Sequence, residues 1–306
     1  MIAYIARRLA TALPTALGVA TLAFFLLHLV PGDAVDVMLG ETATAADKGA
    51  LRHDLGLDLP LGVQYLQFVS GLAHGDLGTS MRSGLPVSSI LADRAGATAA
   101  LALAAIVLSL MIALPLGCIA ALRPNTFFDR AALGFALAGV AIPNFWLGPM
   151  LILVFSVNLG LLPVSGAGTP AHFVLPAITL GASMAGLSAR LVRSTVLETL
   201  REDYVRTARA KGLSETVVVM RHALGNALTP MITIVGLEAG ALLGGAVVTE
   251  TIFAWPGIGR LVIEAISARD LPLVRGCVLA IALTYVVVNL IADLAYAWAD
   301  PRIRYE

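Results

Sequence analysis

The sequence has few charged residues, few aromatic residues and almost no cysteine. Charged residues make up 13% of the 306 positions, aromatic residues 6%, and there are two cysteines. With 58% hydrophobic residues and a mean hydropathy of +0.87, this composition excludes a soluble globular domain. Both cysteines lie in apolar runs, where they are expected to pack as small apolar residues rather than build a disulfide framework. The net charge is zero, so we expect no nucleic acid partner.

Two kinds of catalytic motif are also missing. The chain has no G-x-x-x-x-G-K-[ST] sequence, so it lacks the backbone cradle, the Lys and the Mg²⁺-binding hydroxyl that ATP hydrolysis needs. Its five histidines are scattered and none belongs to an H-E-x-x-H motif, which excludes the usual zinc protease. We therefore expect no enzyme activity, no bound metal and no cofactor on this chain.

Long apolar runs are abundant. A helix that crosses a membrane needs about 20 mostly apolar residues, because lipid offers no partner to backbone polar groups. Six segments meet this requirement, and they predict an all-α membrane protein with a single transmembrane domain over 1–306. The predicted spans are residues 9–30, 95–122, 131–157, 173–189, 228–248 and 274–298. The turn-forming residues of 158–170 separate the third span from the fourth.

The distribution of Arg and Lys predicts the orientation of the spans. Positive charge resists export, so loops rich in Arg and Lys stay in the cytoplasm. This rule places both termini and the loop 196–228 in the cytoplasm, and the long loop 31–94 outside. Arg7 and Arg8 precede the first apolar run, but that run is too long for a cleavable signal peptide.

The external loop contains an amphipathic stretch. Residues 60–72 place Leu61, Tyr65, Phe68 and Leu72 on one helical face. Such a helix could lie on the membrane, cover the mouth of a pathway or pack on its own bundle.

The cytoplasmic loop 196–228 is expected to hold two short helices. Gly212 is placed to end the first, and Ser214 to cap the second. Ala208 and Gly212 are four residues apart, which favours a small face that another protein could approach closely. Arg206, Arg209 and Lys211 would flank this face and reach a partner's carboxylates or carbonyls. The same charges also fit positive-inside charge beside anionic lipid, and spacing alone does not separate the two interpretations.

This loop resembles the EAA loop of binding-protein-dependent ABC transporter permeases, in particular the dipeptide and oligopeptide branch. RTARAKG at 206–212 and NALTP at 226–230 carry the resemblance, although Arg206 stands where the broader pattern has Glu. Further matching segments run along the chain: PGD at 31–33, the stretch 55–87, IPNFWLG at 142–148, LGLLPVSG at 159–166, ETIFAWPGIGRL at 250–261 and DPRIR from 300.

The resemblance implies a permease of type I ABC importer architecture in a bacterial inner membrane. Expected partners are a second similar permease, two ATP-binding subunits that bind ATP and Mg²⁺, an external substrate-binding protein and membrane lipid. The coupling helix that contacts an ATPase subunit would comprise Tyr204, Arg206, Thr207, Ala208, Arg209, Ala210, Lys211 and Gly212.

Polar residues within or beside the spans are candidates for the substrate pathway. Glu238 lies near the middle of the fifth span, where an ionisable group usually faces a cavity or a partner. It could contact a peptide amino group or a partner helix, or be hydrogen-bonded within the bundle. Asn144 follows Pro143, which favours a kink in the third span. Glu250 and Trp255 follow the fifth span and, by resemblance, would belong to a re-entrant loop at the outer gate.

An ion- or proton-coupled secondary carrier is the alternative function. It would use buried acids such as Glu238 and Asp293 as proton sites and would need no ATPase. The absence of a convincing internal repeat and the presence of the coupling loop favour the importer. The cargo does not follow from the sequence: relatives handle dipeptides, oligopeptides, glutathione and nickel complexes.

Overall fold

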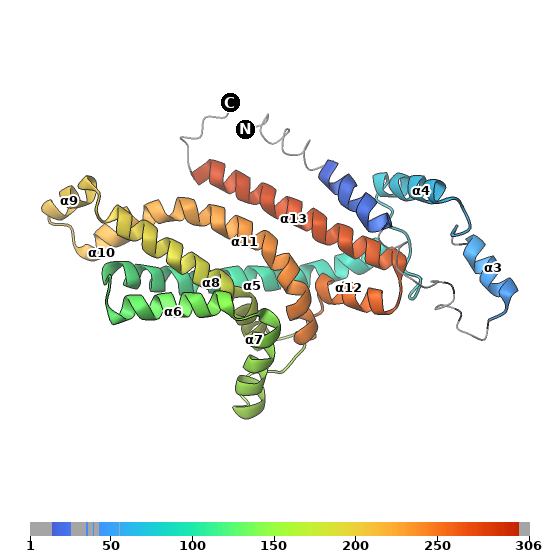
Figure 1. Cartoon of the computed structure of the whole chain (residues 1–306), viewed down its shortest axis with the longest axis horizontal. Helices are drawn as coiled ribbons and strands as arrows, with labels where there is room; N and C mark the ends of the chain where they lie inside the picture. Colours follow the sequence, from blue (N-terminus) through green and yellow to red (C-terminus); the bar gives the residue numbers. More distant parts are fainter. Residues whose placement is uncertain (1–13, 26–34, 36–38, 40–42, 55, 300–306) are drawn as a thin grey trace. The chain divides into compact units, whose positions relative to one another are not determined.

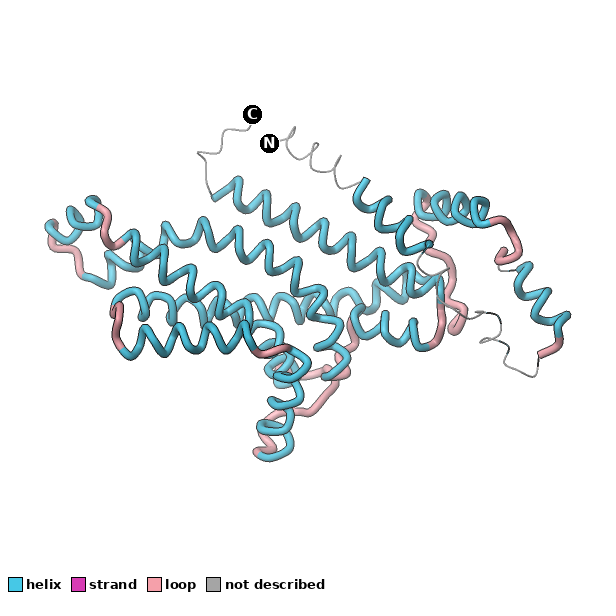
Figure 2. Tube along the Cα trace, in the orientation of Figure 1, coloured by secondary structure: helices cyan, strands magenta, loops and turns pink. Residues whose placement is uncertain are grey.

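The structure is a computed structural model that describes residues 14–25, 35, 39, 43–54 and 56–299. Helices account for most of this part of the chain, and Figure 2 shows short loops between them and no strand among the described residues. One isolated β-bridge joins Thr79 and Pro86. The all-α prediction is therefore confirmed for the described part of the chain.

The helices are labelled as in Figure 1. An unlabelled helix at Pro14–Phe25 comes first. It is followed by α3 (Ala45–Asp54), α4 (Leu61–Ala73), α5 (Val87–Leu122), α6 (Phe127–Ala141), α7 (Asn144–Leu151), a π-helical segment (Ile152–Asn158), α8 (Ala171–Thr199), α9 (Asp203–Ala210), α10 (Glu215–Val217), a second π-helical segment (Val218–Ala223), α11 (Leu224–Ile252), α12 (Ile258–Ser267) and α13 (Leu271–Ala299).

Among the described residues, three helices are long and apolar enough to cross a membrane: Val87–Leu122, Ala171–Thr199 and Leu271–Ala292. Two bent pairs raise the number to five: Phe127–Ala141 with Asn144–Asn158, and Pro230–Gly240 with Gly244–Ile252. The predicted first span extends outside the described residues, which hold only its Pro14–Phe25 portion. The count of six spans and the position of both termini stay predictions.

The third span predicted at 131–157 is divided into two helices. Helix α6 ends at Ala141, and the helix that follows is bent from it by 107°. The residue before a proline is pushed out of the helical region, and Ile142 is accordingly extended at φ −86° and ψ 118°. The expected kink at Pro143 is thus a complete break. With 15 residues, α6 is about 22 Å long and does not cross a 30 Å hydrocarbon layer alone.

The described residues belong to two compact units. One comprises Met1–Thr98 with Pro256–Val286, and the other Ala99–Trp255 with Val287–Glu306. Helices α5 and α13 each contribute to both units. The expectation of a single transmembrane domain over 1–306 stays a prediction.

In the larger unit α8 is the central helix, packed on α6 and α11. Glycines allow α6 and α8 to approach closely. A Cβ atom on Gly139 would lie 2.5 Å from the carbonyl oxygen of Ala182, and one on Gly186 would collide with the carbonyl oxygen of Ala136. Small residues at such contacts are typical of helix pairs in membranes.

In the smaller unit α4 packs on the Pro14–Phe25 helix. The ring centroids of Phe24 and Phe68 are 5.6 Å apart, and the Tyr65 hydroxyl lies 2.8 Å from Oγ1 of Thr21. These contacts confirm the amphipathic helix predicted at 60–72. Of its three possible environments, these contacts support packing on the chain itself, through Tyr65 and Phe68.

A buried carboxylate joins two distant segments of the same unit. Asp270, 1% exposed, accepts hydrogen bonds from the Ser80 hydroxyl at 2.5 Å and from the backbone N–H groups of Met81 at 3.1 Å and Arg82 at 3.3 Å. It also accepts from the Leu273 N–H at 3.2 Å, which caps the N-terminus of α13. One side chain therefore fixes both the 79–86 turn and the start of a membrane helix.

Candidate functional site in the loop between α8 and α11

Helix α9 is a short amphipathic helix whose inner face packs on its own loop. Val205 and Ala208 are buried, with exposed fractions of 0% and 6%, and they contact Val218 and the half-buried Leu200. The remaining residues of α9 are exposed. Eight residues are too few for a stable isolated helix, so this packing is what holds α9 in shape. Figure 1 shows α9 beyond the C-terminal end of α8.

A Schellman motif ends α9. Gly212 has φ +80°, a conformation that glycine adopts without steric cost. Its N–H donates to the Arg209 carbonyl at 2.9 Å, and the Leu213 N–H donates to the Ala208 carbonyl at 3.3 Å. The prediction that Gly212 ends the first helix of this loop is confirmed.

A bidentate ion pair closes the turn. The Arg209 guanidinium donates to the Glu215 carboxylate, with Nη2 to Oε1 at 2.6 Å and Nε to Oε2 at 3.1 Å. This contact holds the pKa of Glu215 below its ordinary value and raises the pKa of Arg209. Both side chains are well exposed, at 53% and 40%, so solvent screens the pair and it contributes under about 1 kcal/mol.

The second short helix expected in this loop does not exist as a separate element. Ser214 is the N-cap residue of α10, but its side chain makes no capping hydrogen bond. From Glu215 the chain stays helical through α10, the π-helical segment and α11 to Ile252. Neither Gly225 nor Pro230 ends this helix, so the loop connects directly to a membrane helix.

The interpretation of Ala208 as part of an exposed small face is wrong. Ala208 points into the loop, and Gly212 lies beyond the end of α9 rather than on the same helical face. The exposed positions are the other residues predicted for coupling: Tyr204, Arg206, Thr207, Arg209, Ala210, Lys211 and Gly212. The exposed surface of α9 is therefore mainly cationic and polar.

Two of the predicted pathway residues lie along α11 and at the helix break. Glu238 is half-buried on α11, and its Oε2 atom is buried without a hydrogen-bond partner. Asn144 begins α7, and its amide nitrogen would lie 3.2 Å from a Cβ atom on Gly245. Asn144 therefore contacts α11 beyond the bend in that helix.

Asp293, a proton site in the carrier alternative, has a side chain outside the described part of the structure.

The other two predicted pathway residues are buried. Glu250 has an exposed fraction of 0% and Trp255 of 2%. The Trp255 ring packs edge-on against Phe173 with centroids 4.5 Å apart. The backbone N–H of Trp255 donates to the backbone carbonyl of Glu250 at 2.8 Å. Neither side chain is open to solvent, so lining a gate would require this turn to move.

Within the described residues, no group of three or more His, Cys, Asp or Glu could hold a metal ion.

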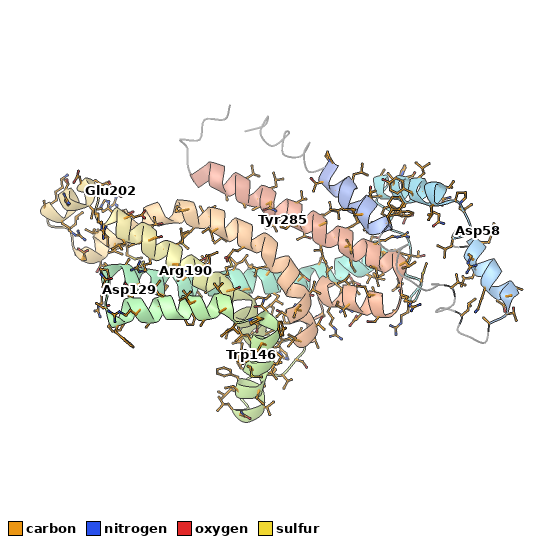
Figure 3. The ribbon with its side chains drawn as sticks, viewed as in Figure 1. Asp58, Asp129, Trp146, Arg190, Glu202 and Tyr285 are labelled. Atoms are coloured by element: carbon orange, nitrogen blue, oxygen red, sulfur yellow. The ribbon has the colours of Figure 1, made fainter. Side chains whose placement is uncertain are left out.

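An ion pair near the end of α8 was missed from the sequence. Arg193 of α8 donates to Asp129 of α6, with Nε to Oδ1 at 2.5 Å and Nη2 to Oδ2 at 2.7 Å. The Asn125 N–H adds a third hydrogen bond at 2.8 Å. Figure 3 labels Asp129 at the start of α6 and Arg190 on α8, one turn before Arg193. Sixty-four residues separate the partners, so no local pattern pairs them.

Comparison with known proteins assigns the chain to a family. Residues 113–305 match the model of the binding-protein-dependent transport system inner membrane component, and residues 1–102 match the N-terminal model of the same kind of protein. The chain is 41% identical to the dipeptide transport system permease protein DppB of Escherichia coli K12, over the full length of both. It is 42% identical to the glutathione transport system permease protein GsiC of Salmonella choleraesuis strain SC-B67, again over both full lengths.

The chain is an inner-membrane component of a binding-protein-dependent transport system. Solved structures support the fold of this permease. A chain of the inward-facing MetNI methionine ABC transporter matches with a TM-score of 0.55 and 19% identity, covering 70% of the permease and 97% of that chain. A chain of an amino acid ABC transporter with histidines matches with a TM-score of 0.51 and 15% identity, covering 71% and 95%. The predicted family and inner-membrane location are confirmed, and a secondary carrier is not favoured.

Proposed function

We propose that this permease forms half of a pathway that imports dipeptides, oligopeptides or a related small solute such as glutathione. The full-length similarity to a dipeptide permease and a glutathione permease carries this proposal. The other half would be a second similar permease. An external substrate-binding protein would deliver the cargo, and two ATPase subunits that bind ATP and Mg²⁺ would supply the energy. Both termini and the α9 loop would face the cytoplasm.

The α9 loop is proposed as the element through which an ATPase subunit moves the membrane helices. Val205 and Ala208 anchor α9 on Val218, which lies at the start of the continuous helix through α11. At its other end, the loop follows directly from the C-terminal end of α8 at Thr199. A push on α9 therefore reaches two membrane helices that pack on each other. A rigid connection of this kind is what a domain motion needs in order to reach the membrane.

The contact with the ATPase subunit is proposed on the exposed surface of α9. Tyr204 and Thr207 lie on this surface with the cationic Arg206 and Lys211. Guanidinium and ammonium groups suit the carboxylates and backbone carbonyls of a groove. Ala208 acts behind this surface by allowing α9 to sit close to Val218.

Pathway roles for Asn144, Glu238, Glu250 and Trp255 remain part of the proposal. Glu238 has the strongest support, since a buried carboxylate oxygen without a partner is costly unless a ligand or another subunit satisfies it. A peptide amino group and a polar group on the second permease both fit this requirement. Glu250 and Trp255 would contribute only after their turn opens.

The experiment compares Ala210→Trp with Ala210→Ser in the complete complex. Ala210 is exposed on α9, so the bulky side chain should block docking without disturbing the loop, whereas serine should be tolerated. We expect the tryptophan variant to reach the membrane but to lose ATPase co-purification and uptake of labelled dialanine. Normal co-purification and uptake in this variant would remove α9 from the proposal. Uptake into vesicles that contain only this chain would overturn ATP-driven import.

A further inference from the structure

A cavity in the smaller unit has both apolar and polar walls, and it contains a cationic group that has no anionic partner among the described residues. Its volume is about 260 Å³, and it lies between α4, the 76–81 segment and the first turn of α13. The side chains that matter for its chemistry are Gln67, Phe68, Asp76 and Arg275. A water molecule takes about 30 Å³, so the cavity has room for a small organic molecule. It is below the range of about 300 to 1,000 Å³ typical of drug-sized ligands.

Arg275 is held in the wall of this cavity by aromatic rings. Its guanidinium carbon lies 4.8 Å from the ring centroid of Phe24 and 5.7 Å from that of Phe68. These two rings stack on each other with an angle of 28° between their planes. Aromatic faces attract a cation and hold it in position, but they accept no conventional hydrogen bonds. The arrangement therefore fixes the guanidinium and leaves its N–H groups to other partners.

Among the described residues, no carboxylate pairs with the N–H groups of Arg275. Its Nε atom is buried and has no hydrogen-bond partner, and no ion pair joins it to an acid in the described part of the chain. A buried N–H of a charged group that makes no hydrogen bond reduces the stability of the fold. Three other arginines instead pair with a carboxylate, at N···O distances of 2.7 Å or less: Arg193, Arg209 and Arg260. Arg275 lines the cavity and has no carboxylate partner among the described residues.

The cavity also offers an anionic group. Asp76 lines it, and Oδ1 of this side chain accepts a hydrogen bond from the Gly78 N–H at 2.8 Å. A carboxylate has about four acceptor positions, so capacity remains for a ligand donor. One wall thus carries a guanidinium and another a carboxylate, which together suit a molecule with both charges.

We propose that Arg275 is the anion-binding residue of a site for a small zwitterion, whose carboxylate or phosphate binds the guanidinium and whose ammonium group faces Asp76. Arginine binds such oxyanions through two parallel hydrogen bonds, a geometry that fits either group. Two sources carry this chemistry: a short peptide, and the headgroup of phosphatidylethanolamine. The peptide source rests on the proposed import function, whereas the headgroup source is independent of it.

The test uses the complete transport complex in two arms. In the first, the complex is purified from nanodiscs containing phosphatidylethanolamine or phosphatidylcholine, and retained lipid is measured by native mass spectrometry. In the second, binding of labelled dialanine to lipid-exchanged complex is compared with binding of dialanine amide, which lacks the carboxylate. Arg275→Gln should lower binding of the true ligand on the order of tenfold, and Arg275→Lys should retain part of it.

Arg260→Gln is the matched control, because Arg260 lies in the same unit but outside this cavity and pairs with Glu264 at 2.7 Å. Thermal unfolding of each variant checks that it folds. If Arg275→Gln does not fold, Asp76→Asn tests the other half of the site and should lose the preference for an ammonium group. The site is overturned if neither probe binds the wild-type complex, or if both bind Arg275→Gln and Arg260→Gln equally.

Uptake of dialanine by the wild-type complex is measured in the same preparation. Failure of that uptake overturns dipeptide import and leaves the phosphatidylethanolamine arm to decide the site. Normal uptake together with binding that ignores Arg275 overturns the site and leaves peptide import in place.

Discussion

Two turns of this permease are each held by one carboxylate, and the two carboxylates differ in burial. Asp270 is 1% exposed and accepts four hydrogen bonds from the 79–86 turn and the start of α13. Glu215 is 53% exposed and pairs with Arg209 alone. A buried acceptor cannot exchange its partners for water, so its removal leaves several donors unsatisfied. The comparison indicates a fixed turn in one unit and an adjustable loop in the other.

This difference suits the proposed roles of the two regions. A loop that must follow an ATPase subunit benefits from contacts that solvent can replace at low cost. A turn that sets the start of a membrane helix benefits from contacts that cannot be replaced. The ion pair of Asp129 and Arg193 lies between these extremes, with exposed fractions of 3% and 22%.

The largest effect is expected for Asp270→Ala. The change leaves the Ser80 hydroxyl and three backbone N–H groups without their acceptor, which should cost about 3 kcal/mol or more. Thermal unfolding of the purified permease measures this cost. Asp93→Ala, at an exposed position of the same unit, is the control. Equal melting temperatures for the two variants would break the comparison.

A slightly smaller loss is expected when Asp129 or Arg193 is replaced singly by alanine. Each single change strands a partly buried charge and should cost about 3 kcal/mol, while the double variant should cost less than the sum. A double-mutant cycle on thermal unfolding gives the coupling. Additive losses would show that the pair does not join α6 to α8.

An intermediate effect is expected for Gly212→Ala. No atom lies within 4 Å of the added Cβ, so the cost is the positive φ alone, about 1 to 2 kcal/mol. Gly212→Asn should cost less, because asparagine tolerates this conformation. Amide hydrogen exchange in α9 reports the loss locally. Unchanged protection in the alanine variant would contradict the role of the Schellman motif.

The smallest effect is expected from acid. The pKa of Glu215 is lowered in the folded loop, so its contribution is complete above its ordinary pKa and is lost as the pH falls through the lowered value. The loss should stay under about 1 kcal/mol and be absent in Glu215→Gln. Hydrogen exchange of α9 at neutral pH and at low pH measures it. A loss of α9 already between pH 8 and 6 would require another titrating group.

Much of the fold could be predicted from the sequence, because its signals are local. Apolar runs predicted the helices, the aromatic face of 60–72 predicted α4, and Gly212 predicted the end of α9. Pro143 signalled a kink, whereas the structure has a full break there, after which α7 packs against α11. Such packing has no signature in a single apolar run.

The candidate site shows the same limit. Spacing placed Ala208 on α9 but could not tell which face would be covered, because Val218 reaches it across a turn. The partners of Asp270 lie up to 190 residues away, so the residue reads as an ordinary loop acid. In the sequence, Arg275 is one charge at the start of the predicted sixth span. The rings that contact it, Phe24 and Phe68, come from two other parts of the chain, so no local pattern predicts the contact.

The break between α6 and α7 restricts what can surround it. Pro143 has no N–H, so the Gly139 carbonyl loses the donor that a continuous helix would supply. Hydrocarbon tails cannot replace that donor, and an unsatisfied carbonyl among them costs several kcal/mol. Wherever this elbow lies within the hydrocarbon layer, water or a polar group of this or another polypeptide must therefore satisfy the carbonyl, which keeps lipid tails away from it.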